Sequence, residues 1–221
     1  MTSQMPVVRK PQGAAVGSSS RTRFRPHGAL SVLSVLALFG ILVWLGLASL
    51  NAVPDVVPAE ASPLVFSADR AMTDLRVLTA APRPVGSAGN AAIRDYLMGQ
   101  IAALGLSPQL QQTHVFRQTP GFPEAHVMAV ENVLVRVPGS DAGSKALLVS
   151  GHYDSVATSV GASDCAMCTV TVLETLRAVV AAAEAGQPLH NDVIFLFTDA
   201  EEIGVAGATG FTRDHPWAAG P

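Results

Sequence analysis

The pattern of apolar and polar positions changes character twice along this chain. The first feature is an unbroken apolar run from Ala29 to Leu50, 22 residues without a charged side chain. A helix of this length crosses a bilayer core of about 30 Å at about 1.5 Å per residue. A buried core helix would normally show a polar stripe, and a cleaved signal peptide usually has an apolar run of only about 7–15 residues. We therefore expect an uncleaved transmembrane helix over residues 29–50, surrounded by membrane lipid.

The flanks of this run are unequal in charge. Five basic residues precede it and no acidic residue does: Arg9, Lys10, Arg21, Arg23 and Arg25. Positive charge is retained on the cytoplasmic side, so the expected topology has a cytoplasmic N-terminus and an extracytoplasmic or lumenal remainder. Residues 1–28 are rich in Ser, Pro, Gly and Arg, and we expect them to form a disordered cytoplasmic tail. Residues 51–65 contain several prolines, and we expect them to form a linker.

From residue 66 onwards the pattern becomes that of a globular domain, which we expect to span 66–221. Apolar spacing predicts a helix capped by Ser67, a second from Asn90 to Gly105, and a third over residues 164–185. Short apolar runs predict strands over residues 127–137, 146–150 and 193–198. The order strand, helix, strand over residues 146–198 indicates a βαβ unit. The expected fold class is therefore α/β, with a mixed, largely parallel sheet between helices.

Polar side chains that suit metal chemistry follow two of these predicted strands. His152 and Asp154 follow the strand at 146–150, and Glu201 and Glu202 follow the strand at 193–198. Open α/β sheets place their sites beyond the carboxyl ends of neighbouring strands. Singly, each residue has an ordinary explanation as a satisfied histidine, a turn or helix cap, or a solvated acidic face. Their joint placement, together with Asp164, favours a metal site.

The residue types suggest which residues bind the metal and which act as a base. His152, Asp164 and Glu202 form a ligand set that suits Zn²⁺ or Mn²⁺, and Asp164 could bridge two ions. Asp154 is placed to accept the second ring N–H of His152 and so to fix its tautomer. Glu201 is left as the general base that takes a proton from water.

Several motifs agree in order and spacing with one known family. GHYDSV, GASD and NDVIFLFTDAEEIGVAGA, with RPVGSAGN and the RDYL helix upstream and HPWA downstream, resemble the cocatalytic zinc exopeptidases of the aminopeptidase Y family. In particular they resemble its membrane-anchored branch, the endoplasmic-reticulum metallopeptidase and vacuolar membrane protease group. The likeness runs from about Phe66 to Pro221. It implies two zinc ions in a complete domain and hydrolysis of peptide substrates at a free N-terminus.

The same resemblance implies the same five roles: His152 and Glu202 as zinc ligands, Asp164 as the bridge, Glu201 as the base and Asp154 as the partner of His152. It also implies two further ligands, an acidic residue after the Glu201–Glu202 pair and a later histidine. Neither falls within the matching motifs up to Pro221, so we expect this chain to be a partial domain.

The segment after Asp164 departs from the family pattern. Relatives usually continue with a second Asp or Asn and glycines, whereas this chain reads Cys165-Ala166-Met167-Cys168. A CxxC pair at a helix start can serve redox chemistry or form a disulfide, but no second CxxC or thioredoxin-like context accompanies it. We expect the cysteines mainly to act as buried small residues.

These observations lead to one main hypothesis and two alternatives. The first is a membrane-anchored zinc exopeptidase, by resemblance an aminopeptidase. The second is a non-catalytic ectodomain that keeps the peptidase fold for binding, which the altered segment after Asp164 favours, and the third is a thiol oxidoreductase. Nucleic-acid binding is excluded, because 17 acidic residues face 14 basic ones and five of the basic residues lie in the N-terminal tail.

Overall fold

The computed structural model describes residues 26–50, 54–118, 125–141 and 143–219. The chain divides between Pro54 and Asp55 into two compact units, and each is treated by itself. Most of the predicted cytoplasmic tail lies outside the described residues.

The first unit contains helix α1, Pro26–Leu50. Residues Gly28–Leu50 form a candidate membrane span of 23 residues with a mean hydropathy of 2.5 and none of the window buried. A signal sequence near the N-terminus passes the same test of length and hydropathy. A second segment of suitable length and hydropathy, Ala162–Glu184, is half buried inside the folded unit and belongs to its core.

The first two helices of the second unit begin at serine caps. The Ser67 hydroxyl accepts the Arg70 N–H at the start of α2, Ala68–Leu78, as expected. Helix α3, Ala88–Ala103, begins earlier than the predicted Asn90 because the Ser87 hydroxyl accepts the Asn90 N–H. Asn90 is therefore inside the first turn, where its side chain is free for another role.

The sheet contains four strands in the order β1-β2-β4-β3. They are β1 Gln109–Gln118, β2 Ala125–Val137, β3 Leu147–His152 and β4 Val193–Thr198. The pairs β1–β2 and β2–β4 are antiparallel, and β3–β4 is parallel. The prediction of a mixed sheet between helices is confirmed, as is the βαβ unit, but within the described residues parallel pairing is the minority. Strand β1 was not predicted, because QLQQTHVFRQ buries only Val115.

The third predicted helix starts later than its apolar pattern suggested. A single π turn, Ala162–Ala166, precedes α4, Met167–Glu184. Asp164 (φ −122°, ψ 95°) and Cys165 (φ −130°, ψ 50°) have non-helical backbone angles, and the peptide between them is cis. Asp164 therefore lies in the turn before the helix. Beyond β4 the chain adds α5, Ala206–Asp214, and a short 3₁₀ turn, Pro216–Ala218, neither of which was predicted.

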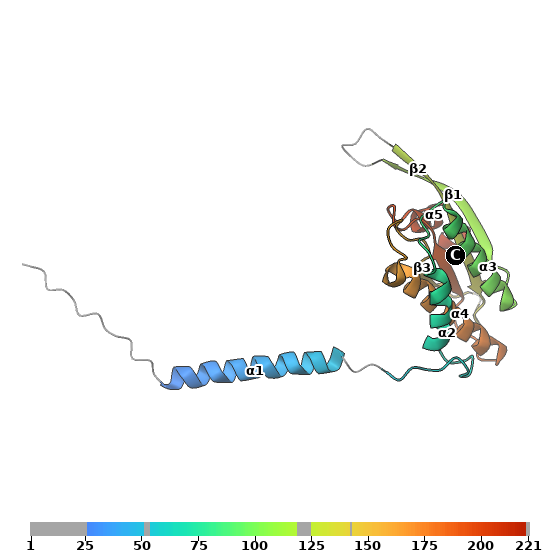
Figure 1. Cartoon of the computed structure of the whole chain (residues 1–221). Helices are drawn as coiled ribbons and strands as arrows, with labels where there is room; N and C mark the ends of the chain where they lie inside the picture. Colours follow the sequence, from blue (N-terminus) through green and yellow to red (C-terminus); the bar gives the residue numbers. More distant parts are fainter. Residues whose placement is uncertain (1–25, 51–53, 119–124, 142, 220–221) are drawn as a thin grey trace, which may run out of the picture. The chain divides into compact units, whose positions relative to one another are not determined.

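Both faces of the sheet are covered (Figure 1). Alternate residues of β2 and β4, such as Val133, Val135 and Phe195, pack in one core with α2, α3 and α4. The residues between them, including Leu134 and Leu196, pack against Phe211 of α5. All six residues of β4 are buried, so this strand lies in the middle of the layered unit. The segment with Glu201 and Glu202 follows directly after its carboxyl end.

Part of the predicted linker is bonded to the folded unit. The Ser67 hydroxyl donates to the carbonyls of Val57 and Pro58, and the Arg70 guanidinium donates to those of Ala59, Ala61 and Val65. The Glu174 carboxylate of α4, fully buried, holds Arg70 from the other side. Residues 57–65 are thus an integral strap of the second unit.

Candidate active site

The parallel pair β3–β4 brings the two predicted motifs together. His152 is the last residue of β3 and pairs with Thr198, the last residue of β4. The Tyr153 N–H donates to the Thr198 carbonyl at 2.9 Å, so the two chains leave the sheet side by side. His152 and Asp154 therefore meet the Glu201–Glu202 segment at one carboxyl edge, as the sequence predicted.

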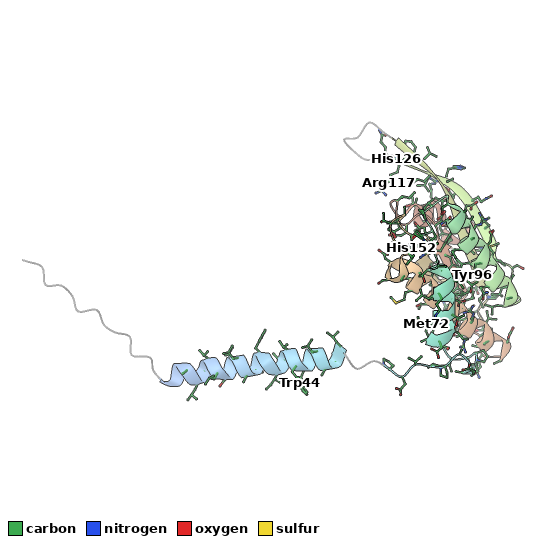
Figure 2. The ribbon with its side chains drawn as sticks, in the orientation of Figure 1. Trp44, Met72, Tyr96, Arg117, His126 and His152 are labelled. Carbon is green, nitrogen blue, oxygen red and sulfur yellow. A yellow bond between two sulfur atoms is a disulfide. The ribbon has the colours of Figure 1, made fainter. Side chains whose placement is uncertain are left out.

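His152, whose position in the folded unit is labelled in Figure 2, contacts three carboxylates. Its Nδ1 lies 3.3 Å from Asp154 Oδ1, while its Nε2 lies 3.3 Å from Asp164 Oδ1 and 3.9 Å from Glu201 Oε2. Burial alone would lower the pKa of His152, but hydrogen bonds with Asp154 and Asp164 and the negative charges of Asp154 and Glu201 raise it above its ordinary value. One ring nitrogen is thus held by a buried partner and the other faces two carboxylates.

Asp154 has a wider role than the sequence indicated. Its carboxylate is fully buried, and besides His152 it accepts the Glu201 N–H at Oδ1 and the Glu202 N–H at Oδ2, each at 3.1 Å. A buried carboxylate with several donors is strongly held. Asp154 therefore fixes His152 and the backbone of both glutamates together.

The turn that carries Asp164 is tightly packed on its backbone and open at its side chain. The Asp164 side chain is 81% exposed and points toward His152. Gly161, at φ +53°, has no room for a Cβ, which would lie 2.5 Å from the Asp164 carbonyl oxygen. Cys165 and Cys168 form a disulfide with a Cα–Cα distance of 5.1 Å. This corrects the expectation that the cysteines serve as unlinked small residues.

The segment with the two glutamates is a closed loop of unusual backbone geometry. Ala200 and Val205 have positive φ values of 58° and 59°, which cost about 1–2 kcal/mol each in residues other than glycine. The Ala206 N–H donates to the Ala200 carbonyl at 2.9 Å and closes the loop. Burial, followed by the negative charge of Asp164, raises the pKa of Glu202. The strained loop thus holds Glu202 within the electrostatic reach of Asp164.

Two residues that were not predicted from the sequence, Arg83 and Asp199, also hold the site in place. Arg83, buried, donates from its guanidinium to the carbonyls of Leu78, Tyr153, Val160 and Gly161. It therefore ties the His152 segment to the Asp164 turn. The position of Arg83 in the RPVGSAGN motif was the sequence feature that could have identified it.

Asp199 is the second such support. It is buried, and its carboxylate accepts hydrogen bonds from Asn90 Nδ2 at 3.0 Å and from the Glu131 N–H at 3.3 Å. Burial raises the pKa of Asp199 to about 6. No pattern in the sequence distinguishes this aspartate from its acidic neighbours, because its role depends on contacts with distant elements.

The donor set suits zinc in type and in direction. Ligand atoms about 2.0–2.1 Å from a tetrahedral zinc lie about 3.3 Å from one another. His152 Nε2 and Asp164 Oδ1 have this separation, and burial, followed by the negative charge of Asp164, raises the pKa of Glu202. Among the residues that the structure describes, no three His, Cys, Asp or Glu side chains already close into a metal site. We conclude that the residues fit zinc as a partial ligand set.

Comparison with known proteins also indicates a metallopeptidase. Residues 132–220 match peptidase family M28. The chain is 36% identical over 167 residues to endoplasmic reticulum metallopeptidase 1 of Rattus norvegicus, covering 70% of this chain and 18% of that protein. It is 33% identical over 164 residues to the vacuolar membrane protease of Candida glabrata, covering 67% and 17%. The chain thus spans less than a fifth of the length of these relatives.

Solved structures confirm the fold. A zinc aminopeptidase from Bacillus subtilis superposes with a TM-score of 0.59 at 14% identity, covering 70% of this chain and 67% of that one. A glutaminyl cyclase from Porphyromonas gingivalis superposes with a TM-score of 0.54 at 23% identity, covering 70% and 55%. Two different activities share this architecture, so the fold alone does not decide the reaction.

Proposed function

We propose that this chain, whose residues 132–220 match peptidase family M28, is part of a membrane-anchored, zinc-dependent exopeptidase of the aminopeptidase type. The observation that carries the proposal is the position of His152 Nε2, which faces Asp164 Oδ1 at 3.3 Å and Glu201 Oε2 at 3.9 Å. Two carboxylates approach the same ring nitrogen there, at the strand edge where this fold places its chemistry.

The proposed roles follow from the surroundings of each side chain. His152, Asp164 and Glu202 would hold zinc in the complete domain. Bound zinc would supply a Lewis acid for the scissile carbonyl and lower the pKa of water. Glu201, with 39% of its side chain exposed, accepts the proton of the attacking water and later passes it to the leaving amine. Asp154 holds the base and the ligands in fixed relative positions.

The aminopeptidase type rests on the motifs GHYDSV and NDVIFLFTDAEEIGVAGA, which resemble those of the aminopeptidase Y family and so imply a free N-terminus as the recognised end of the substrate. The carboxylates of Asp154, Asp164, Glu201 and Glu202 would balance the charge of bound zinc, so they serve the metal and not the choice of substrate end.

Anchoring through α1 is the second part of the proposal. Its support is the uncharged run of residues 29–50, the basic flank before it and the membrane location in the name of the vacuolar relative. The N-terminus is then cytoplasmic and the peptidase unit extracytoplasmic or lumenal. A reporter fused after Pro221 tests this topology, and a reporter that reads as cytoplasmic contradicts it.

The assignment of the two glutamates is tested in the complete protein with an aminoacyl-p-nitroanilide and zinc analysis. Glu201→Gln should abolish turnover and leave the bound zinc nearly unchanged, whereas Glu202→Ala should lose zinc as well. Glu184→Gln, an exposed change at the end of α4, is the matched control and should retain both. Equal zinc loss in the Glu201 and Glu202 variants would overturn the roles. Wild-type protein that binds no zinc and cleaves nothing would support the binding-only alternative.

A further inference from the structure

Strand β1, the outer strand of the sheet, packs against the loop that carries Glu201 and Glu202. Alternate side chains of β1 point to the same face of the sheet. On that face Gln111 donates to the Gly210 carbonyl, Thr113 donates to Asp214 Oδ2, and Val115 packs in a cluster with Ala200 and Ala206. Each of these contacts is made to the segment 200–214. Strand β1 therefore supports the acidic loop and the helix that follows it.

The fourth contact in this row, made by Arg117, reaches the loop itself. Arg117 Nη1 donates to the Gly204 carbonyl at 2.7 Å. Gly204 lies two residues after Glu202 at φ +108°, and a Cβ at this position would lie 1.6 Å from Arg117 Nη1. The guanidinium thus occupies the space that the absent side chain leaves. Figure 2 shows Arg117 and its cross-strand partner His126 on the hairpin, on the same side of the unit as His152.

The loop is held at only a few points besides this one. Asp154 binds the N–H groups of Glu201 and Glu202, and the Gly204 N–H donates to the Glu201 carbonyl at 2.9 Å. The carbonyl of Gly204 faces away from these supports and receives Arg117. Because the loop contains two residues at positive φ, it needs external contacts to keep this shape.

We infer that Arg117 is a positioning residue for the proposed peptidase site: its hydrogen bond to Gly204 fixes the loop that presents Glu201 and Glu202. The inference rests on the proposed function. Arg117 acts through the backbone, so its loss changes the placement of the base and of one zinc ligand. Substrate binding at other points is left intact, and the effect falls on kcat.

The chain offers a closely matched control. Arg213 of α5 is also an exposed arginine that donates to a backbone carbonyl, that of His114 on the same strand, at 2.7 Å. It links β1 to α5 without touching the loop. Arg117→Met and Arg213→Met each remove one arginine–carbonyl bond, and Arg213→Met also removes the ion pair of Arg213 with Asp214. Arg117→Lys restores a cationic donor at the first position.

Two measurements on the complete protein test the inference. The first is amide hydrogen exchange of the peptide containing residues 199–206, without metal or substrate. We expect exchange about tenfold faster in Arg117→Met, wild-type behaviour in Arg213→Met, and partial recovery in Arg117→Lys. The second is steady-state cleavage of an aminoacyl-p-nitroanilide, in which Arg117→Met should lower kcat about tenfold, or about 1.4 kcal/mol, at nearly unchanged KM.

The outcomes separate this inference from the proposed function. Unchanged loop exchange in Arg117→Met, or equal acceleration in Arg213→Met, would overturn the positioning role whether or not the protein is a peptidase. Faster loop exchange in Arg117→Met, combined with a wild-type protein that cleaves no peptide, would support the positioning role and contradict the proposed function. Faster loop exchange with unchanged kcat in an active enzyme would overturn the link between loop position and catalysis.

Discussion

Replacement of Asp154 by asparagine tests whether one carboxylate holds the site together. The wild-type carboxylate accepts from the backbone N–H groups of Glu201 and Glu202 and contacts His152 Nδ1. An asparagine of the same shape has one acceptor oxygen and one NH₂ group. In either amide orientation, one of the two backbone N–H groups faces the NH₂ group and loses its acceptor.

The expected cost follows from this count. A hydrogen bond to a charged group is worth about 1.5–3 kcal/mol, and a buried donor left unpaired costs about 1–3 kcal/mol. The neutral amide recovers part of the desolvation cost of the buried carboxylate, so we expect Asp154→Asn to lower the free energy of unfolding by about 3 kcal/mol. That loss is a large fraction of the roughly 5–15 kcal/mol by which domains are stable.

Urea denaturation of the full chain in detergent, followed by circular dichroism, measures this loss. With a slope of about 2–3 kcal/mol per molar urea, the midpoint should fall by about 1 M. Asp192→Asn is the control: that carboxylate also accepts a backbone N–H, from Gly139 at 2.7 Å, but its ion partner Arg136 has a 37% exposed side chain. We expect about 1 kcal/mol there. A midpoint shift for Asp154→Asn no larger than the control would refute the reasoning.

Two further predictions concern pH and redox state. The pKa of Asp199 is raised to about 6 in the folded chain, so the folded chain binds a proton on this carboxyl more tightly than the unfolded chain does. Protonation of Asp199 therefore adds to the free energy of unfolding below about pH 4, and this contribution is lost as the pH rises through 6. The free energy of unfolding of wild type relative to Asp199→Asn should therefore fall by about 3 kcal/mol between pH 4 and 7, and a flat difference in urea midpoints would contradict it. The Cys165–Cys168 disulfide closes a loop of four residues, so the double serine variant should be about 2 kcal/mol less stable. Reductant should bring wild type down to the same urea midpoint, and a wild type unaffected by reductant would exclude a stabilising disulfide.

The parts of the fold that the sequence predicted are those set by local patterns. Strand β4 matched its apolar run residue for residue, and Ser67 capped its helix as expected, because burial and capping leave direct marks in the sequence. Strand β1 was missed because it is an outer strand with polar side chains on both faces. The start of α4 was misplaced because the apolar pattern continues through a turn whose geometry is set by tertiary contacts.

The same distinction applies to the candidate site. The structure brings His152, Asp154, Asp164 and Glu201 together as the two strand ends predicted. The supports of this group could not be predicted in the same way. Arg83 donates to main-chain carbonyls, and Asp154 accepts from main-chain N–H groups, so these contacts depend on the backbone path and not on residue types.

The parallel pairing of β3 and β4 also sets the order in which the site can be completed during synthesis. His152 and Asp164 are twelve residues apart, whereas the two glutamates join them only after α4 has formed and β4 has paired with β3. Parallel pairing requires this long crossover to close first, and its loop entropy is paid before the contacts form. A chain emerging residue by residue therefore brings the two glutamates to His152 and Asp164 only when its acidic loop has docked. If these residues bind zinc as proposed, zinc captured earlier would meet only the His152 half of the site.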